Sequence, residues 1–220
     1  YKVPDSVSDN VVAGANCGLS QVLFGLQKIG LTAGESLVIQ GAGGLGLYAA
    51  AIGKDMGAQV TMIEGIPERM ELARRFGAEE IVDLQEHSTA EERVERVQSL
   101  TGGPGADVVL EVTGVPAAFV EALQLARPGG KVLEIGNVSL GAEHEVSLAP
   151  GLITRKNLRV QGVVRYQPWY LHKALRFLER KHSDHPFDEL SDREYGLEDV
   201  GEAIELEEAR KVARPAIVPA

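Results

Sequence analysis

Four glycines fall within six positions of the stretch VIQGAGGLGLYAAAIG, residues 38–53. Gly41, Gly43 and Gly46 have the spacing G-x-G-x-x-G, and Gly44 lies between them. In such a turn the first glycine permits the tight bend, the second lets the backbone approach a pyrophosphate, and the third lets helix and strand pack closely. The positive end of the helix that begins near Gly44 would stabilise the pyrophosphate. Because a strand precedes the glycines and a helix follows, the spacing predicts a dinucleotide site.

An acidic residue stands where such a site needs one. Glu64 ends the run AQVTMIE (58–64), 18 residues after Gly46, and a ribose-binding carboxylate is expected about 20 residues beyond the glycines. A carboxylate there can accept both adenosine ribose hydroxyls and would repel a 2′-phosphate, so the sequence favours NAD over NADP. The alternative interpretation of Glu64 is a solvated acid at the end of a strand.

Cys17 is the single cysteine of the 220 residues. It cannot form a disulfide within the chain, so a reducing cytoplasm is the expected compartment. Taken alone, a lone cysteine is usually a small hydrophobic residue of the core. His182 and His185, in the sequence HSDH, are expected to decorate the end of a helix rather than to bind metal.

Short runs rich in β-branched residues alternate with helical patterns along the chain. The order predicts an α/β fold, a doubly wound parallel sheet of the Rossmann type with helices on both faces. Turns are expected at 101–107 and 126–130, and a surface loop at 177–187. The expected strands are 36–40, 58–64, 79–84, 106–112, 131–136 and 158–164, and the expected helices are 44–56, 67–76, 89–100, 116–126 and 168–182.

Composition and charge exclude several classes of partner. The hydrophobic fraction is 44% and the formal net charge is −10, which argues against nucleic acid and against an anionic membrane surface. No apolar run approaches the ~20 residues of a membrane span. The chain starts at Tyr1 within a sequence, YKVPDSVSD, that reads as the middle of a longer protein, so we expect an N-terminal portion to precede it.

Several motifs together resemble the C-terminal part of a medium-chain dehydrogenase/reductase of the zinc-dependent alcohol dehydrogenase type. They are GANCGLSQVLFGL, the stretch from GESLVIQGAGGLG to GAEEIVD, TGGPGADVVLEVTG and LQLARPGGKVLEIG, and the likeness extends over essentially all of the chain. The resemblance implies that residues 1–17 end a GroES-like catalytic domain, that 18–164 form an NAD-binding Rossmann domain, and that 165–220 return to the catalytic domain. By this resemblance, the main body of that catalytic domain would be largely missing from the sequence.

The resemblance also assigns roles to individual residues. Cys17 would be the third protein ligand of a catalytic zinc, whose other ligands and proton relay lie outside this chain. Leu45 would support the nicotinamide ring and Arg69 would reach the adenosine ribose. Gln21 stands where the family often has a threonine that contacts the nicotinamide, which departs from the pattern. The remaining cofactor contacts would be Thr113, Gly114, Ile135, Gly136, Asn137, Val163 and Arg165 around the nicotinamide half and Arg214 near the pyrophosphate.

The resemblance implies a zinc-dependent alcohol or polyol dehydrogenase that transfers hydride from its substrate to NAD. The substrate would be a small alcohol or carbonyl compound, and the protein a homodimer or homotetramer. A zinc-free quinone or enoyl reductase using NADPH is the nearest competing function, and Glu64 and Cys17 both count against it. A non-catalytic dinucleotide-binding module is a second competing function. A methyltransferase is a third, and it fits the GADVVLEVTG stretch less well.

Overall fold

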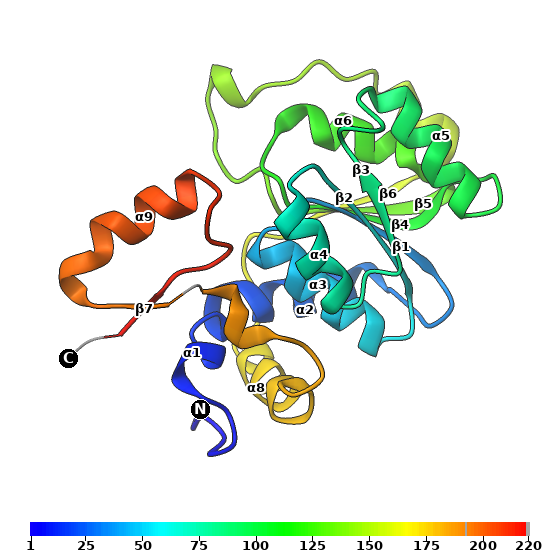
Figure 1. Ribbon diagram of the computed structural model, residues 1–220. Coiled ribbons are helices and arrows are strands. Elements are labelled where there is room, and N and C mark those ends of the chain that lie inside the picture. Colours follow the sequence, from blue (N-terminus) through cyan, green and yellow to red (C-terminus); the bar gives the residue numbers. More distant parts are fainter. Residues whose placement is uncertain (192, 219–220) are drawn as a thin grey trace.

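The computed structural model describes residues 1–191 and 193–218 (Figure 1). Its centre is a parallel sheet of six strands in the order β3-β2-β1-β4-β5-β6, which confirms the predicted doubly wound α/β fold. The order reverses between β1 and β4, so the loops after these two strands diverge and leave a crevice at the carboxyl edge. The strands are β1 (Ser36–Gln40), β2 (Gln59–Glu64), β3 (Glu80–Asp83), β4 (Ala106–Glu111), β5 (Ala126–Glu134) and β6 (Arg159–Gly162).

Helices cover both faces of the sheet and bury a separate apolar cluster on each. One cluster joins the sheet to α2 (Ser20–Ile29), α3 (Gly44–Asp55), α4 (Pro67–Arg75) and α8 (Trp169–Lys181). The other joins it to α5 (Ala90–Leu100), α6 (Pro116–Leu125) and α7 (Gly151–Lys156). The central strands are therefore buried on both faces, as their nearly continuous apolar sequences require.

Local sequence signals fix several helix ends. Thr89 and Glu92 form a capping box at the start of α5, in which each side chain accepts from the other residue's backbone N–H. Pro67 lies in the first turn of α4, where its missing N–H costs nothing. Gly30 ends α2 in the left-handed conformation with φ +77°, which favours glycine.

Two local predictions were wrong. Residues 126–130 do not form a turn between elements but open β5, where the pairing with β4 shifts register and Gly129 has φ +73°. Residues 177–187 are not simply a surface loop, because α8 continues to Lys181 and Phe187 is buried. The Phe187 ring packs edge-on against Phe76 and Phe177, at centroid distances of 5.2 and 6.3 Å, and so anchors the segment after α8 to the core.

The segments at both ends of the chain pack against the α2 and α3 side of the sheet. Val7, Val11 and Ala15 from the first segment belong to the same buried cluster as Tyr170 and Leu178 of α8. Farther along, α9 (Val200–Glu208) lies to one side of the main body (Figure 1). None of the helices within residues 1–191 and 193–218 is both long and apolar enough to span a membrane. The remaining elements are α1 (Asp9–Val12), η1 (Ala15–Leu19), η2 (Ala142–His144), η3 (Phe187–Leu190), β7 (Glu194–Tyr195), η4 (Leu197–Asp199), α9 (Val200–Glu208) and β8 (Ala216–Ile217).

Candidate cofactor site

The three glycines of the turn after β1 have different surroundings. Gly41 has φ +99°, a conformation that side chains rarely adopt. A Cβ atom on Gly46 would lie 1.9 Å from the Gly41 carbonyl oxygen, so only glycine lets α3 pack this closely on the turn. A Cβ atom on Gly43 would meet only the Arg69 guanidinium, at 4.0 Å. The space over Gly43, at the N-terminus of α3, is thus open to a ligand.

The Glu64 carboxylate is buried and ties the glycine turn to the end of β2. Its Oε2 atom accepts a hydrogen bond from the Ala42 N–H at 2.9 Å, and Oε1 accepts from the N–H groups of Gly65 at 2.7 Å and Ile66 at 3.1 Å. Each carboxylate oxygen has two lone pairs, so Oε2 keeps acceptor capacity for a ribose hydroxyl. Glu64 therefore has a structural role, and its role in binding the ribose stays a prediction.

A cavity of about 210 Å³ opens beside Glu64 and Gly43. We call it the Glu64 cavity. Arg69 lines it from α4, and Arg210 lines it from the segment after α9. No side-chain ion pair joins either arginine to another described residue, so both cations are available to an anionic ligand. The sequence analysis did not single out Arg210, and no local motif marks it, because the C-terminal segment brings it here. The apolar part of the lining is Ile63, Leu84, Val112 and Val115.

Arg214 reaches the glycine turn from the far end of the sequence. A Cβ atom on Gly44 would lie 3.5 Å from the Arg214 Cβ atom, and one on Gly18 would lie 3.0 Å from Nη1. The guanidinium lies over the Tyr48 ring, 5.8 Å from its centroid. The backbone N–H of Arg214 donates to the Leu190 carbonyl at 2.7 Å, which holds the segment in place. A cation therefore stands between the start of α3 and the turn that carries Cys17.

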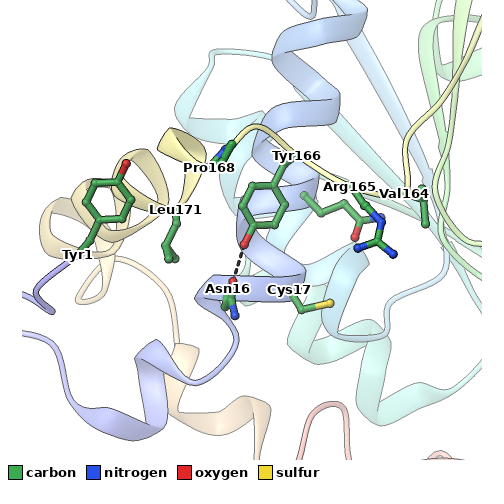
Figure 2. Close-up of a pocket in the computed structure, with 9 residues that line it drawn as sticks. Tyr1, Asn16, Cys17, Val164, Arg165, Tyr166, Pro168 and Leu171 are labelled. Carbon is green, nitrogen blue, oxygen red and sulfur yellow. Dashed lines mark hydrogen bonds between the residues drawn. The ribbon is translucent and has the colours of Figure 1, made fainter.

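Cys17 lies in η1, a π-helical turn, and its side chain is exposed. It lines a cavity of about 540 Å³, here called the Cys17 cavity, with Gln21 and Arg165 (Figure 2). Figure 2 shows the Cys17 sulfur and the Arg165 guanidinium lining the same opening, while Tyr166 donates to the Asn16 Oδ1 atom at 2.5 Å. The expectation that a lone cysteine is a core residue is wrong here, since the thiol faces the cavity. Tyr1, Val164, Pro168 and Leu171 complete the lining.

A catalytic zinc needs three protein ligands and an open position. Within the described part of the chain, no group of three or more His, Cys, Asp or Glu side chains is arranged to hold a metal ion. The residues present thus fit one thiolate ligand of a zinc site and no more. His182 Nδ1 contacts the Leu178 carbonyl at 2.9 Å, and His185 Nδ1 contacts the Arg75 carbonyl at 3.3 Å.

Two acids, the buried Glu111 and the half-buried Glu134, hold the loops after β4 and β5. Glu111 accepts hydrogen bonds from the N–H groups of Thr113 at 2.6 Å and Gly114 at 3.2 Å, and from the Thr113 hydroxyl. Glu134 accepts from the Asn137 N–H at 2.9 Å. Burial, together with the neighbouring Glu111 carboxylate, raises the pKa of Glu134 to about 7. The sequence analysis missed this pair. The similar runs VLEV (109–112) and VLEI (132–135) place one acid at the end of each strand but do not show that the two strands are neighbours.

The other nicotinamide-side predictions lie on the surrounding elements. The Ile135 and Val163 side chains are buried, so only their main chain can face a ligand. Gln21, the residue that departs from the family pattern, donates from Nε2 to the Val163 carbonyl at 3.1 Å and so ties α2 to the segment after β6. Leu45 is partly buried against the core on the α3 side. A Cβ atom on Gly136 would lie 2.6 Å from the Gly114 nitrogen, so these two loops touch.

Comparison with known proteins decides the family. Residues 44–180 match the family described as zinc-binding dehydrogenase. The chain belongs to the zinc-binding dehydrogenase family. The match begins at Gly44, within the glycine turn, and includes Glu64, Arg69 and the loops after β4 and β5.

Individual relatives agree. The chain is 30% identical over 219 residues to 5-exo-hydroxycamphor dehydrogenase of Pseudomonas putida, covering 99% of this chain and 60% of that protein. It is 30% identical over 211 residues to sorbitol dehydrogenase of Bacillus subtilis, covering 93% of this chain and 55% of that protein. A crystal structure of an alcohol dehydrogenase from Thermotoga maritima superimposes with a TM-score of 0.92 at 28% identity, over 100% of this chain and 60% of that one. The chain thus spans little more than half the length of these relatives.

Proposed function

We propose that this chain is the cofactor-binding part of a zinc-dependent alcohol or polyol dehydrogenase that transfers hydride from its substrate to NAD. Residues 18–164 would be the NAD-binding domain, and residues 1–17 and 165–220 would belong with a catalytic domain that lies outside the chain. We infer that the whole protein works in the cytoplasm as a homodimer or homotetramer. Its substrate would be a small alcohol, or the matching carbonyl compound in the reverse direction.

The observation that carries the proposal is the open space over Gly43, at the N-terminus of α3 and flanked by cations. The backbone N–H groups of the first turn of α3 would donate to a pyrophosphate there, as at pyrophosphate sites in general. Arg214 would neutralise one side of the pyrophosphate, and Arg69 would face the adenosine end from the Glu64 cavity. Glu64 would accept a ribose hydroxyl at Oε2, which favours NAD because a 2′-phosphate there would meet a carboxylate.

The Cys17 cavity would receive the nicotinamide and the substrate. Cys17 would hold one position of the zinc, and Gln21, Val163 and Arg165 would orient the nicotinamide from the other side. When bound, zinc supplies a Lewis acid for the alcohol oxygen and the nicotinamide supplies the hydride acceptor. The side chains of this chain orient the two groups and exclude water.

Titration of the chain with NAD, NADP and AMP tests the proposal. We expect NAD and AMP to bind and NADP to bind more weakly. A chain that binds none of the three contradicts the proposal. Preference for NADPH, together with turnover that persists after zinc is removed from the longer protein, favours the zinc-free reductases.

A further inference from the structure

Three polar side chains lie side by side across the sheet, each at the last position of its strand. The strand register pairs Gln40 of β1 with Glu111 of β4, and Glu111 with Glu134 of β5. All three point to the face of the sheet that α5, α6 and α7 cover, since Val38, Val109 and Val132, two residues earlier, belong to that cluster. Gln40 is 3% exposed and Glu111 is fully buried. A polar row thus runs through an otherwise apolar layer.

The hydrogen bonds of this row leave one carboxyl oxygen without a donor. Glu111 accepts from Thr113 and Gly114 through Oε1 and from Asn137 Nδ2 through Oε2, the last at 3.0 Å. Glu134 accepts from Asn137 through Oε1. The Glu134 Oε2 atom is buried and has no hydrogen-bond partner among the described residues. Asn137 Nδ2 lies between the two acids, 3.2 Å from Glu134 Oε1 and 3.0 Å from Glu111 Oε2. Ionised carboxylates only accept, so a hydrogen bond from one acid to the other would need a proton.

We propose that Glu134 and Glu111 share one proton through the Glu134 Oε2 atom, and that this protonated pair positions the loops after β4 and β5 for the nicotinamide half of the cofactor. The two acids together hold the backbone of Thr113, Gly114 and Asn137. If both carboxyl groups were ionised, their repulsion would drive them apart and would loosen the backbone contacts of both loops at once.

Among the residues that the structure describes, the groups around the pair supply no cation that could replace the proton. On the same side of the sheet, Arg93 of α5 is engaged with Glu121 of α6, at 2.8 and 2.5 Å. Lys156 of α7 donates to the carbonyls of Leu123 and Gln124 at the end of α6. β6 presents Gly162 beside Glu134, and β1 presents the neutral Gln40. His144 and Glu143, in the loop that follows, are exposed and pair with each other.

The pair gains its proton in the folded state, and this fixes the sign of the pH effect. The folded pKa of Glu134, about 7, lies above the ordinary 4.5 because of burial and the Glu111 charge. Its contribution to stability is therefore full below pH 4.5 and is lost as pH rises to about 7. Loosening of the loops is expected above neutral pH.

The first experiment measures the proton directly in the cofactor-free chain. Side-chain carboxyl carbon shifts, followed by NMR from pH 4 to 9, should contain one glutamate resonance with a midpoint near 7. Glu134→Gln should remove that resonance, because the amide donates to Glu111 without titrating. The exposed Glu86→Gln is the matched control and should leave the resonance in place. If every glutamate in the parent chain titrates below pH 5.5, the shared proton is refuted, whether or not Glu134→Gln folds.

The second experiment concerns positioning and rests on the proposed function. The Kd of NAD should rise at least about threefold from pH 6 to pH 8.5 in the parent chain, while the Kd of AMP, which lacks nicotinamide, should not. In Glu134→Gln the NAD value should stay constant over that range. NAD binding that follows AMP at every pH refutes the positioning role alone. A chain that binds AMP and NAD at no pH refutes the proposed function as well, while the carboxyl titration still decides whether the proton is shared.

Discussion

Replacing Gly43 by alanine should separate binding from folding. Gly43 has φ −76° and ψ −175°, an extended conformation open to any residue, and its added Cβ would meet nothing closer than Arg69 at 4.0 Å. Gly43 caps α3, where alanine is somewhat less favourable than glycine, so the free energy of unfolding should fall by no more than about 1 kcal/mol. The same methyl group would occupy the space proposed for the pyrophosphate. NAD affinity should fall about 100-fold, which is about 2.8 kcal/mol.

Gly46→Ala is the matched contrast, three residues along the same turn. Its Cβ would lie 1.9 Å from the Gly41 carbonyl oxygen, and a backbone atom cannot move aside as a flexible side chain can. We expect the free energy of unfolding to fall by about 3 kcal/mol or more. The first variant should thus fold without binding, and the second should lose stability as well.

Urea denaturation and calorimetric titration with NAD measure the two quantities for both variants. AMP should lose affinity for Gly43→Ala as NAD does, because both ligands place a phosphate at the start of α3. The reasoning is refuted if Gly43→Ala binds NAD as the parent does, or if Gly46→Ala is as stable as Gly43→Ala.

Three further variants test other parts of the structure. The parent chain should bind NAD at least about tenfold more tightly than NADP, which is about 1.4 kcal/mol, and this preference should shrink in Glu64→Ser. Equal affinities of the parent chain for NAD and NADP would contradict the role of Glu64. Arg93→Ala leaves the Glu121 carboxylate, 9% exposed, without its partner and should cost about 3 kcal/mol in urea denaturation; a loss below about 1 kcal/mol would refute this. Burial alone would raise the pKa of Asp107, but hydrogen bonds from Ser36 lower it below 3.8. The ionised Asp107 therefore stabilises the fold above pH 3.8, and this stabilisation is lost as the pH falls. In Asp107→Asn, the melting temperature should fall less steeply than in the parent chain as the pH is lowered. An equally steep fall in both proteins would contradict this prediction.

Much of the fold could be predicted because its signals are local. The alternation of short apolar runs with helical patterns predicts the strands and helices of the sheet. The glycine spacing at 41–46 predicts where β1 ends and α3 begins. The turn predicted at 126–130 was wrong because proline and glycine also occur at a strand's irregular beginning, where β5 first pairs with Ala106 and then shifts register.

The parts of the site that depend on distant packing could not be read locally. Arg210 and Arg214 reach the glycine turn only because the C-terminal segment folds back over it. The meeting of Glu111 with Glu134 depends on the register of two strands joined by a helix, which no local pattern fixes. No local pattern marks Cys17 as exposed, because its turn η1 packs against α3 and α8, which lie farther along the chain.

The central claim is that this chain supplies the cofactor site and one zinc ligand of an alcohol dehydrogenase. The most direct test is NADH production, over a panel of small alcohols and polyols, by the chain alone and by a protein extended at its N-terminus. The account predicts no turnover by the chain alone with or without added Zn²⁺, since Cys17 is one ligand where three are needed. The extended protein should oxidise alcohols. The Cys17→Ala variant of that protein should lose its bound zinc and most of its activity. Zinc-independent turnover by the short chain, or an extended protein indifferent to Cys17→Ala, would contradict the account.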